Sequence, residues 1–332
     1  MNLCILSTQR FKKNHVSNDM IEALEKAIIN EFDNTSIIYI SEIVSKINSK
    51  VSKRLKKPIV TDHIALFKTK KYSPNMILVI AMGPKHLESY VPLLKKLHCK
   101  KAVYCIDTWK STYERWLFLL NEAKVDTVFL AYKASVPYFR KHIDNVFFLP
   151  QSMNSQWFYP RKNRIKKHLF MQMGRKNATL DEWVLRYLDE MGLSDDCYIR
   201  ELEKGKIIYQ SFDKLAEEIG NTYFFVLAPR DFDDSEITGS ISDVTARFYE
   251  GMACKTLLIG FKPRDTFDEL FPSKNAMIEV ESYENFKEKV DYYYEHFDEY
   301  NKICEDNYNY LIKHHTWKIR AEYLMECLKK II

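Results

Sequence analysis

Glycine, long apolar runs and paired cysteines are scarce or missing in this sequence. Only 8 of its 332 residues are glycine, and the stretch Leu6–Arg10 contains none, so the first predicted strand is not followed by a glycine-rich phosphate loop. No stretch approaches 18 consecutive apolar residues, which excludes a hydrophobic transmembrane helix. The 7 cysteines form no CxxC pair and show no metal-ligand spacing.

The cysteine pattern and the N-terminus predict a cytoplasmic protein. The stretch Met1–Ser7 is too short for a signal peptide and has no basic leader, so we interpret it as a first strand. An odd, scattered set of cysteines in a chain without a signal peptide is typical of a reducing compartment.

Apolar strands and amphipathic helices alternate along the whole sequence. Strands are predicted at 2–6, 36–40, 76–82, 101–106, 126–130 and 146–149, and again at 168–173, 198–202, 222–227, 256–261 and 275–280, with continuous apolar runs at 76–82 and 256–261. The main helices between them are expected at 19–32, 41–57, 85–97, 109–123, 133–142, 180–191 and 212–219. This alternation predicts an α/β fold of two Rossmann-like, doubly wound domains.

The two halves of the chain carry opposite net charges. Residues 1–160 hold 24 Lys and Arg against 13 Asp and Glu, a balance of +11, and the remaining 26 and 32 give residues 161–332 a balance of −6. We therefore expect different partners for the two halves. The polar segment 154–166 is a natural linker, and the predicted domains are 1–155, 156–317 and a C-terminal helix at 318–332.

The most informative segment is 242–260, which predicts a short helix running into a buried strand. Arg247 and Glu250 are three residues apart, so they stand side by side on the helix. An arginine there can hold a phosphate, and a glutamate can accept hydrogen bonds from a ribose diol. The alternative is an ordinary surface salt bridge.

The same segment resembles the donor-nucleotide segment of the GT-B glycosyltransferases. The matching run is Ser-x-x-x-x-Arg-x-x-Glu-x-x-Ala-Cys at 242–254, and it is most similar to the family-1/family-4-like group that includes the spore-maturation-protein type. Leu149–Asn154, Met173–Lys176 and His315–Arg320 resemble the linker, the phosphate-contacting turn and the ending of that group. Lys255 departs from the usual glycine, and Ser242 stands where many relatives carry a first glutamate.

The resemblance implies two domains that face a cleft, an acceptor-side first domain, a nucleotide-sugar-binding second domain and a last helix that returns to the first. It implies transfer of a sugar from a UDP-, GDP- or dTDP-linked donor to a glycan or lipid-linked acceptor of the cell surface, and it favours retention of configuration. The implied donor-binding residues are Arg175, Lys176, Ser242, Thr245, Arg247 and Glu250.

Two further carboxylate positions have alternative interpretations. Asp107, at the end of a predicted first-domain strand, is the candidate catalytic residue, and the alternative is an N-cap for the next helix. Asp231-Phe-Asp233-Asp234 resembles a metal-binding DxD motif. Because the predicted cations can neutralise a diphosphate, we expect metal-independent activity and no cofactor.

A basic helix predicted at 41–57 suggests contact with an anionic membrane. Six basic residues accompany the apolar stripe Ile43, Ile47, Val51 and Leu55, as in helices that lie at a membrane interface. The alternative is that this stripe packs on the sheet. The segment lacks interleaved aromatic residues, so nucleic acid is not an expected partner. Rival functions are a nucleotide-sugar epimerase and a non-catalytic basic binding or scaffold protein.

Overall fold

The chain forms two compact units. The computed structural model describes residues 1–331 except 9–15, 162–164, 175, 201–208 and 210. Unit 1 comprises Met1–Gln151 together with Trp317–Ile332, and unit 2 comprises Ser152–Thr316. Arg175 therefore lies outside the described residues.

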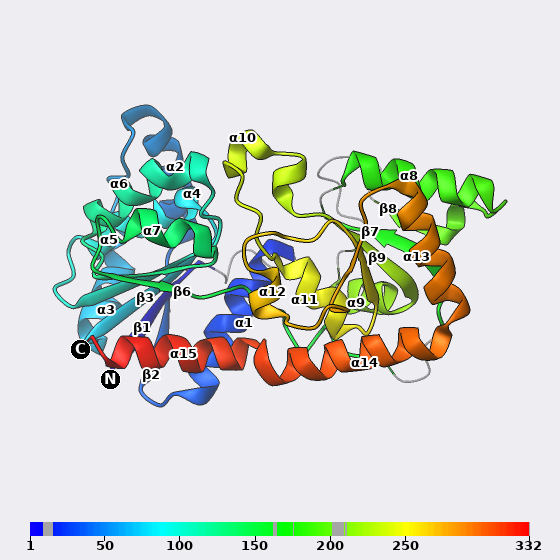
Figure 1. The fold of residues 1–332 in the computed structure, drawn as a ribbon. Coiled ribbons are helices and arrows are strands. Elements are labelled where there is room, and N and C mark those ends of the chain that lie inside the picture. The colour runs from blue at the N-terminus through cyan, green and yellow to red at the C-terminus, as the bar shows by residue number, and fades with distance from the viewer. Residues whose placement is uncertain (9–15, 162–164, 175, 201–208, 210, 332) are drawn as a thin grey trace. The chain divides into compact units, whose positions relative to one another are not determined.

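Unit 1 is built around a six-stranded parallel sheet with the order β2-β1-β3-β4-β5-β6 (Figure 1). Its strands are β1 (Leu3–Ser7), β2 (Thr35–Tyr39), β3 (Met76–Ala81), β4 (Lys100–Cys105), β5 (Thr127–Leu130) and β6 (Asn145–Phe148). Its helices are α1 (Val16–Glu31), α2 (Glu42–Leu55), α3 (His63–Tyr72), α4 (Pro84–Leu87), α5 (Val91–Leu94), α6 (Tyr113–Ala123), α7 (Val136–Phe139) and α15 (Trp317–Lys329).

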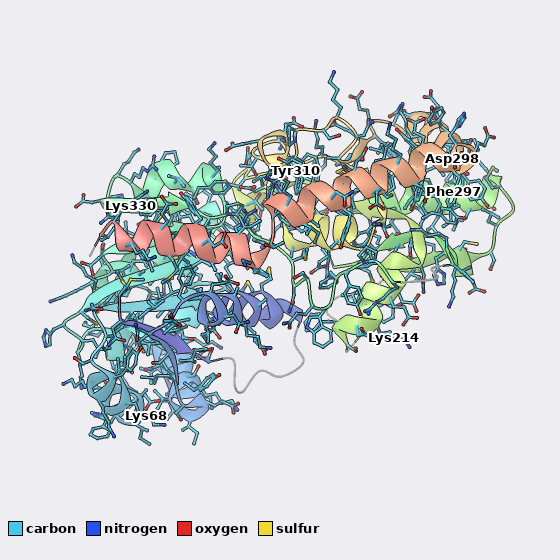
Figure 2. All side chains as sticks on the ribbon, turned by 90° about the horizontal axis from the view of Figure 1, so that it is seen from below. Lys68, Lys214, Phe297, Asp298, Tyr310 and Lys330 are labelled. Atoms are coloured by element: carbon cyan, nitrogen blue, oxygen red, sulfur yellow. The ribbon has the colours of Figure 1, made fainter. Side chains whose placement is uncertain are left out.

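The strands β1 and β3 of unit 1 consist almost entirely of apolar residues because helices cover both faces of the sheet. All residues of β1 and β3 are buried, as expected for parallel strands between two helical layers. The last helix, α15, packs alongside α1 although the two are far apart in sequence (Figure 2). Arg320 of α15 also donates from Nε to the carbonyl oxygen of Pro150 at 3.0 Å, which fixes the helix to the end of the first segment.

Unit 2 contains a five-stranded parallel sheet with the order β11-β10-β9-β7-β8. Its strands are β7 (His168–Gln172), β8 (Tyr198–Arg200), β9 (Thr222–Leu227), β10 (Leu257–Gly260) and β11 (Ile278–Glu279). Its helices are α8 (Ala178–Glu190), α9 (Phe212–Gly220), α10 (Ser235–Thr238), α11 (Ala246–Ala253), α12 (Phe267–Leu270), α13 (Tyr283–Glu295) and α14 (Phe297–His314).

Side chains of alternate strand residues enter two separate cores in unit 2. Phe224 and Val226 of β9 pack in one core with residues of α8, α13 and the first part of α14. Phe225 and Leu227 pack in the other with residues of α9, α11 and α12. The sheet is therefore buried on both faces, and the predicted pair of Rossmann-like, doubly wound domains is confirmed.

Two helical segments of unit 1 differ from the prediction. The helix expected at 85–97 is two short helices, α4 and α5, because Pro92 has no backbone N–H to donate and its ring clashes with a carbonyl one turn earlier. The helix α3 was not predicted. It begins where Asp62 accepts hydrogen bonds from the backbone N–H groups of Ile64 and Ala65 at 3.1 and 2.9 Å.

Gly251 allows α11 to lie directly on its sheet. A Cβ at this position would come within 2.5 Å of Leu258 Cδ2 and 2.7 Å of Phe225 Cδ1. We expect Gly251→Ala to lower the free energy of unfolding in urea by about 1–3 kcal/mol, because an added methyl overpacks the core. Gly83→Ala is the matched control, since a Cβ there meets nothing within 4 Å. Equal stability of the two variants would contradict this packing.

Candidate functional site

The carboxyl ends of β7 and β9 mark the topological switch point of unit 2. These strands are neighbours in the sheet, but the chain leaves β7 toward β8 on one side and β9 toward β10 on the other. In open α/β sheets, ligands bind at such points, outside the carboxyl ends of the strands. Gly174 follows β7, and Ala228 follows β9.

The turn after β7 and the helix α11 meet at this switch point. Gly174 has a φ of +87°, and a Cβ placed on it would be 3.4 Å from Nε of Arg247. The glycine is required both by the left-handed backbone and by the close approach of the arginine side chain. Gly174 and Arg247, from two segments that the sequence assigned to donor binding, are thus brought together here.

Arg247 and Glu250 form an ion pair on α11. Nη1 of Arg247 donates to Oε2 of Glu250, and the side chains are 21% and 7% exposed. The i,i+3 salt bridge that we considered as the alternative therefore exists, but it is largely buried rather than on the surface. Removing two charges from water is costly, so such a pair is weak evidence for stability and is often retained for another reason.

Thr245 and Ser242, which precede α11, differ in burial and in hydrogen bonding. Thr245 is the N-cap residue of α11, is half-buried, and has no side-chain capping bond. Ser242 is fully buried. Its hydroxyl accepts from the backbone N–H of Arg264 at 3.2 Å, and its own N–H donates to Asp265 at 2.7 Å. These bonds favour a structural role for Ser242, whereas Thr245 stays at the helix terminus.

Lys176 forms an ion pair with a carboxylate on α8. Its Nζ lies 2.6 Å from Oδ2 of Asp181, and Arg200 Nη1 contacts both oxygens of the same carboxylate at 3.0 and 3.1 Å. The side chain of Lys176 nevertheless remains 40% exposed. Asp181 thus has two cationic partners, and Lys176 can exchange it for an incoming phosphate oxygen without leaving that carboxylate unpaired.

The three aspartates that resemble a DxD motif have separate partners. Asp231 pairs with Nη2 of Arg264, Asp233 accepts from Nδ2 of Asn177 at 2.9 Å, and Asp234 accepts from Nε of Arg230 at 3.2 Å. Within the described part of the chain, no three His, Cys, Asp or Glu residues converge as a metal site would require. The carboxylates therefore do not form a preassembled site for a divalent cation.

Asp107 lies at the carboxyl end of β4 in unit 1. It is half-buried, and the hydroxyl of Tyr132 donates to its Oδ1 at 3.4 Å. The helix that follows begins at Tyr113 with Thr112 as its N-cap residue, so Asp107 does not cap it as the alternative proposed. Its backbone oxygen instead accepts from Nε1 of Trp116 at 3.0 Å.

A polar cluster that the sequence did not reveal lies at the ends of β1 and β3. The amide N–H of Met82 donates to Nδ1 of His86 at 3.3 Å, so a neutral His86 carries its proton on Nε2. That nitrogen is 2.6 Å from Oγ1 of Thr8, and the hydroxyl of Tyr90 donates to the same oxygen at 3.2 Å. These strands flank the switch point of unit 1, which gives the cluster a ligand-binding position. One feature of the sequence could have revealed this cluster: His86 lies three residues after Gly83, in the segment that follows β3.

Glu25 of α1 is a buried carboxyl group beside this cluster. Ser7 donates to its Oε2 at 3.0 Å, while Oε1 has no hydrogen-bond partner among the described residues. Burial raises the pKa of Glu25 from its ordinary value near 4.5 to about 8, with a smaller opposing contribution from the Ser7 hydrogen bond. The carboxyl group is therefore largely protonated at neutral pH.

Comparisons with known proteins agree with this geometry. Residues 229–326, which include α11 and the segment after it, match the family model described as glycosyl transferase-like. No curated protein matches the sequence.

Solved structures resemble the chain over nearly its whole length. Sucrose-phosphate synthase from Thermosynechococcus elongatus aligns with a TM-score of 0.61 at 10% identity, covering 99% of this chain and 98% of that one. Anabaena HepE in complex with UDP-glucose aligns with a TM-score of 0.59 at 8% identity, covering 99% of both chains. A Neisseria meningitidis UDP-GlcNAc 2-epimerase bound to UDP-GlcNAc has a TM-score of 0.51 at 10% identity, again covering 99% of both.

The structural likeness confirms the predicted GT-B fold. The segment that carries Arg247 and Glu250 is similar to a glycosyl transferase-like family, as the sequence predicted. The spore-maturation-type subgroup stays a prediction.

The raised pKa of Glu25 predicts a pH-dependent stability. Because the folded pKa exceeds the unfolded one, the folded state binds the extra proton, and stability is lost as pH rises from about 4.5 through about 8. Each pKa unit corresponds to about 1.4 kcal/mol. We expect urea unfolding of the wild type to lose about 2 kcal/mol more between pH 6 and pH 8 than Glu25→Gln, which cannot ionise.

Glu22→Gln is the matched control on the same helix. The Glu22 side chain is 51% exposed and pairs with Lys26. Its charge is the smallest of the contributions that raise the pKa of Glu25, after burial, so its removal should leave most of the pH dependence in place. Parallel pH profiles for wild type and Glu25→Gln would contradict a protonated Glu25.

Proposed function

We propose that the chain transfers a sugar from a nucleotide-diphosphate donor to a cell-surface glycan or lipid-linked acceptor. The observation that carries the proposal is the convergence of Gly174 with the Arg247–Glu250 pair at the switch point of unit 2. A nucleotide diphosphate needs a cation for its phosphates and an acceptor for its ribose hydroxyl groups, and this arrangement offers both.

In this proposal each side chain has a distinct task. Arg247, with Lys176 and Arg175 after Gly174, neutralises the charge that develops on the leaving diphosphate. Glu250 accepts hydrogen bonds from the ribose, and Arg247 holds its carboxylate in place. Thr245, the N-cap residue of α11, places its hydroxyl group and the N-terminus of the helix against a phosphate. Unit 2 is therefore the nucleotide-sugar domain.

Unit 1 contributes the acceptor side. Asp107 is the carboxylate that would face the reacting sugar, whose transition state resembles an oxocarbenium ion and is stabilised by nearby negative charge. The resemblance of the sequence to a retaining group favours retention of the anomeric configuration. Two structural neighbours were solved with UDP-glucose and UDP-GlcNAc, which supports uridine diphosphate as the first donor nucleotide to examine.

A nucleotide-sugar epimerase is the second candidate, because one structural neighbour with full coverage is an epimerase bound to its substrate. The two activities differ in their need for an acceptor. An epimerase converts the donor by itself, whereas a transferase releases UDP in proportion to the glycoside that it forms. NMR of the reaction mixture with and without acceptor distinguishes them and also reports the anomeric configuration of the product.

We expect Arg247→Ala, Glu250→Ala and Arg175→Ala each to weaken binding of the donor nucleotide. Loss of a charge-assisted contact should cost about 1.5–3 kcal/mol, measured by calorimetric titration with UDP and the corresponding GDP and dTDP. Lys302→Ala is the control, because Lys302 is an exposed cation on α14 of the same unit. Unchanged nucleotide affinity in all three variants, with folding verified by circular dichroism, would refute the assigned donor site.

We also expect turnover without a divalent metal ion. The cations near Gly174 can stabilise the leaving diphosphate, and Asp231 and Asp233 already have protein partners. The rate of UDP release should therefore be the same in EDTA and in added Mn²⁺. Complete loss of turnover in EDTA, with recovery in Mn²⁺ and no recovery in Asp231→Asn, would show that these aspartates bind metal.

A further inference from the structure

Helix α2 turns its polar side inward and its apolar side to solvent. Its two buried residues are Asn48 and Ser52. Ile43 and Leu55, which belong to the apolar stripe, are 70% and 56% exposed, and Ile47 is 40% exposed. The alternative interpretation of this segment, in which the stripe packs on the sheet, is therefore wrong.

Hydrogen bonds fix α2 in this orientation. Oδ1 of Asn48 accepts from the N–H groups of Ile59 and Val60 at 3.2 and 2.9 Å, and its Nδ2 donates to the Val60 carbonyl at 2.8 Å. The Ser52 hydroxyl accepts from Nη2 of Arg115 at 2.6 Å. Rotating the helix to bury its apolar stripe would break these bonds and leave buried polar groups unsatisfied.

The next helix also carries exposed apolar residues. Asp62 joins the two helices, because its Oδ2 accepts from the N–H of Ser41 at 2.7 Å while its Oδ1 caps α3. Within α3, Ile64 and Phe67 are 71% and 70% exposed. We call the exposed residues of this segment the α2–α3 surface: the apolar Ile43, Ile47, Leu55, Ile59, Ile64 and Phe67 and the basic Lys46, Lys50, Lys53, Arg54, Lys56, Lys57, Lys68, Lys70 and Lys71.

The basic residues of this surface are all exposed. Lys68 on α3 is labelled in Figure 2. Scattered exposed apolar residues are normal, but six large ones within 25 residues, surrounded by lysines, are characteristic of an interaction site.

A cationic pocket lies at the inner edge of α2. It has a volume of about 220 Å³ and is lined by Ser49, Ser52, Lys53, Lys56, Lys85, Glu88 and Arg115. Arg115 is fixed, because it binds Glu88 through Nε at 3.2 Å and donates from Nη1 to the Lys56 carbonyl at 2.6 Å. The three lysines form no ion pair with any residue that the structure describes. Lys53, Lys56, Lys85 and Arg115 thus face a single carboxylate, an excess of positive charge that suits a phosphate group.

We propose that the α2–α3 surface docks on an anionic phospholipid bilayer and that this pocket receives the phosphate of a lipid headgroup. The apolar side chains enter the boundary between headgroups and acyl chains, while the lysines remain at the level of the phosphates. Charge complementarity selects this partner, because an anionic leaflet attracts a dense lysine cluster and a neutral protein surface does not. None of the helices in the described residues is long and apolar enough to cross a membrane, so attachment is peripheral in this proposal.

Sedimentation with liposomes tests the docking surface on the full chain. We expect strong binding to vesicles with phosphatidylglycerol, weak binding to pure phosphatidylcholine, and a decrease with added salt. Each lysine near an anionic leaflet contributes about fivefold to partitioning, so Lys53→Gln/Lys56→Gln/Lys85→Gln should reduce it by roughly 100-fold. Ile43→Ser/Ile47→Ser should reduce it by roughly tenfold or more, since two apolar side chains no longer enter the bilayer.

Matched variants separate location from net charge. Lys274→Gln/Lys302→Gln/Lys313→Gln removes the same charge from exposed positions of unit 2, and Ile165→Ser removes an exposed apolar side chain there. Both should bind vesicles like the wild type. Equal effects of the two lysine triples, equal binding to neutral and anionic vesicles, or wild-type binding by the Ile43→Ser/Ile47→Ser variant would overturn the proposal.

The docking surface does not depend on the proposed sugar transfer. Calorimetric titration of the same variants with UDP keeps the two questions apart. Normal UDP affinity with lost vesicle binding supports the membrane surface, while normal vesicle binding with no nucleotide affinity rejects only the donor site.

Discussion

The close approach of α11 to its sheet is the constraint on which the site of unit 2 depends. Gly251 leaves no room for a side chain between the helix and the residues of β9 and β10 beneath it. Arg247 lies one turn before Gly251 on the same helix and Glu250 lies directly before it, so this contact sets the height of both side chains above the sheet. The arginine then reaches the turn after β7, where Gly174 has no side chain to obstruct it. Two glycines in a glycine-poor sequence thus determine the geometry of the candidate donor site.

Both units concentrate polar groups at the carboxyl ends of their strands, but they satisfy them differently. Unit 2 uses full charges that neutralise one another, as in the pairs of Arg247 with Glu250 and of Arg264 with Asp231. Unit 1 uses hydrogen bonds near its switch point, where His86, Tyr90 and Thr8 contact one another, and burial raises the pKa of the nearby Glu25 carboxyl group to about 8. In the proposed function, the first chemistry would suit a charged donor and the second an uncharged sugar hydroxyl.

Much of the fold could be predicted from the sequence because parallel strands covered on both faces are continuous apolar runs. Buried strands such as β1, β3 and β9 were predicted for that reason, and the spacing of Arg247 and Glu250 correctly placed them side by side. The burial of that pair could not be predicted, since it depends on Gly251 and on the turn at Gly174. The helix α3 was missed because apolar residues lie on its exposed side, at Ile64 and Phe67, as well as on its buried side. Its sequence therefore shows no apolar stripe with helical spacing. The orientation of α2 could not be predicted either. The bonds that hold Asn48 inward come from the backbone of residues 59 and 60, and no pattern of side chains indicates them.

The pairing of α15 with α1 has a consequence for the order in which the protein folds. The ribosome makes α1 before unit 2 and α15 after it, and both helices bury apolar residues, among them Ile21 and Leu24 of α1 and Leu324 and Leu328 of α15. Unit 2 is synthesised as one continuous stretch between them and can complete its core first. Unit 1 lacks the contact of α15 with α1 until unit 2 has been synthesised, so it completes its packing after unit 2.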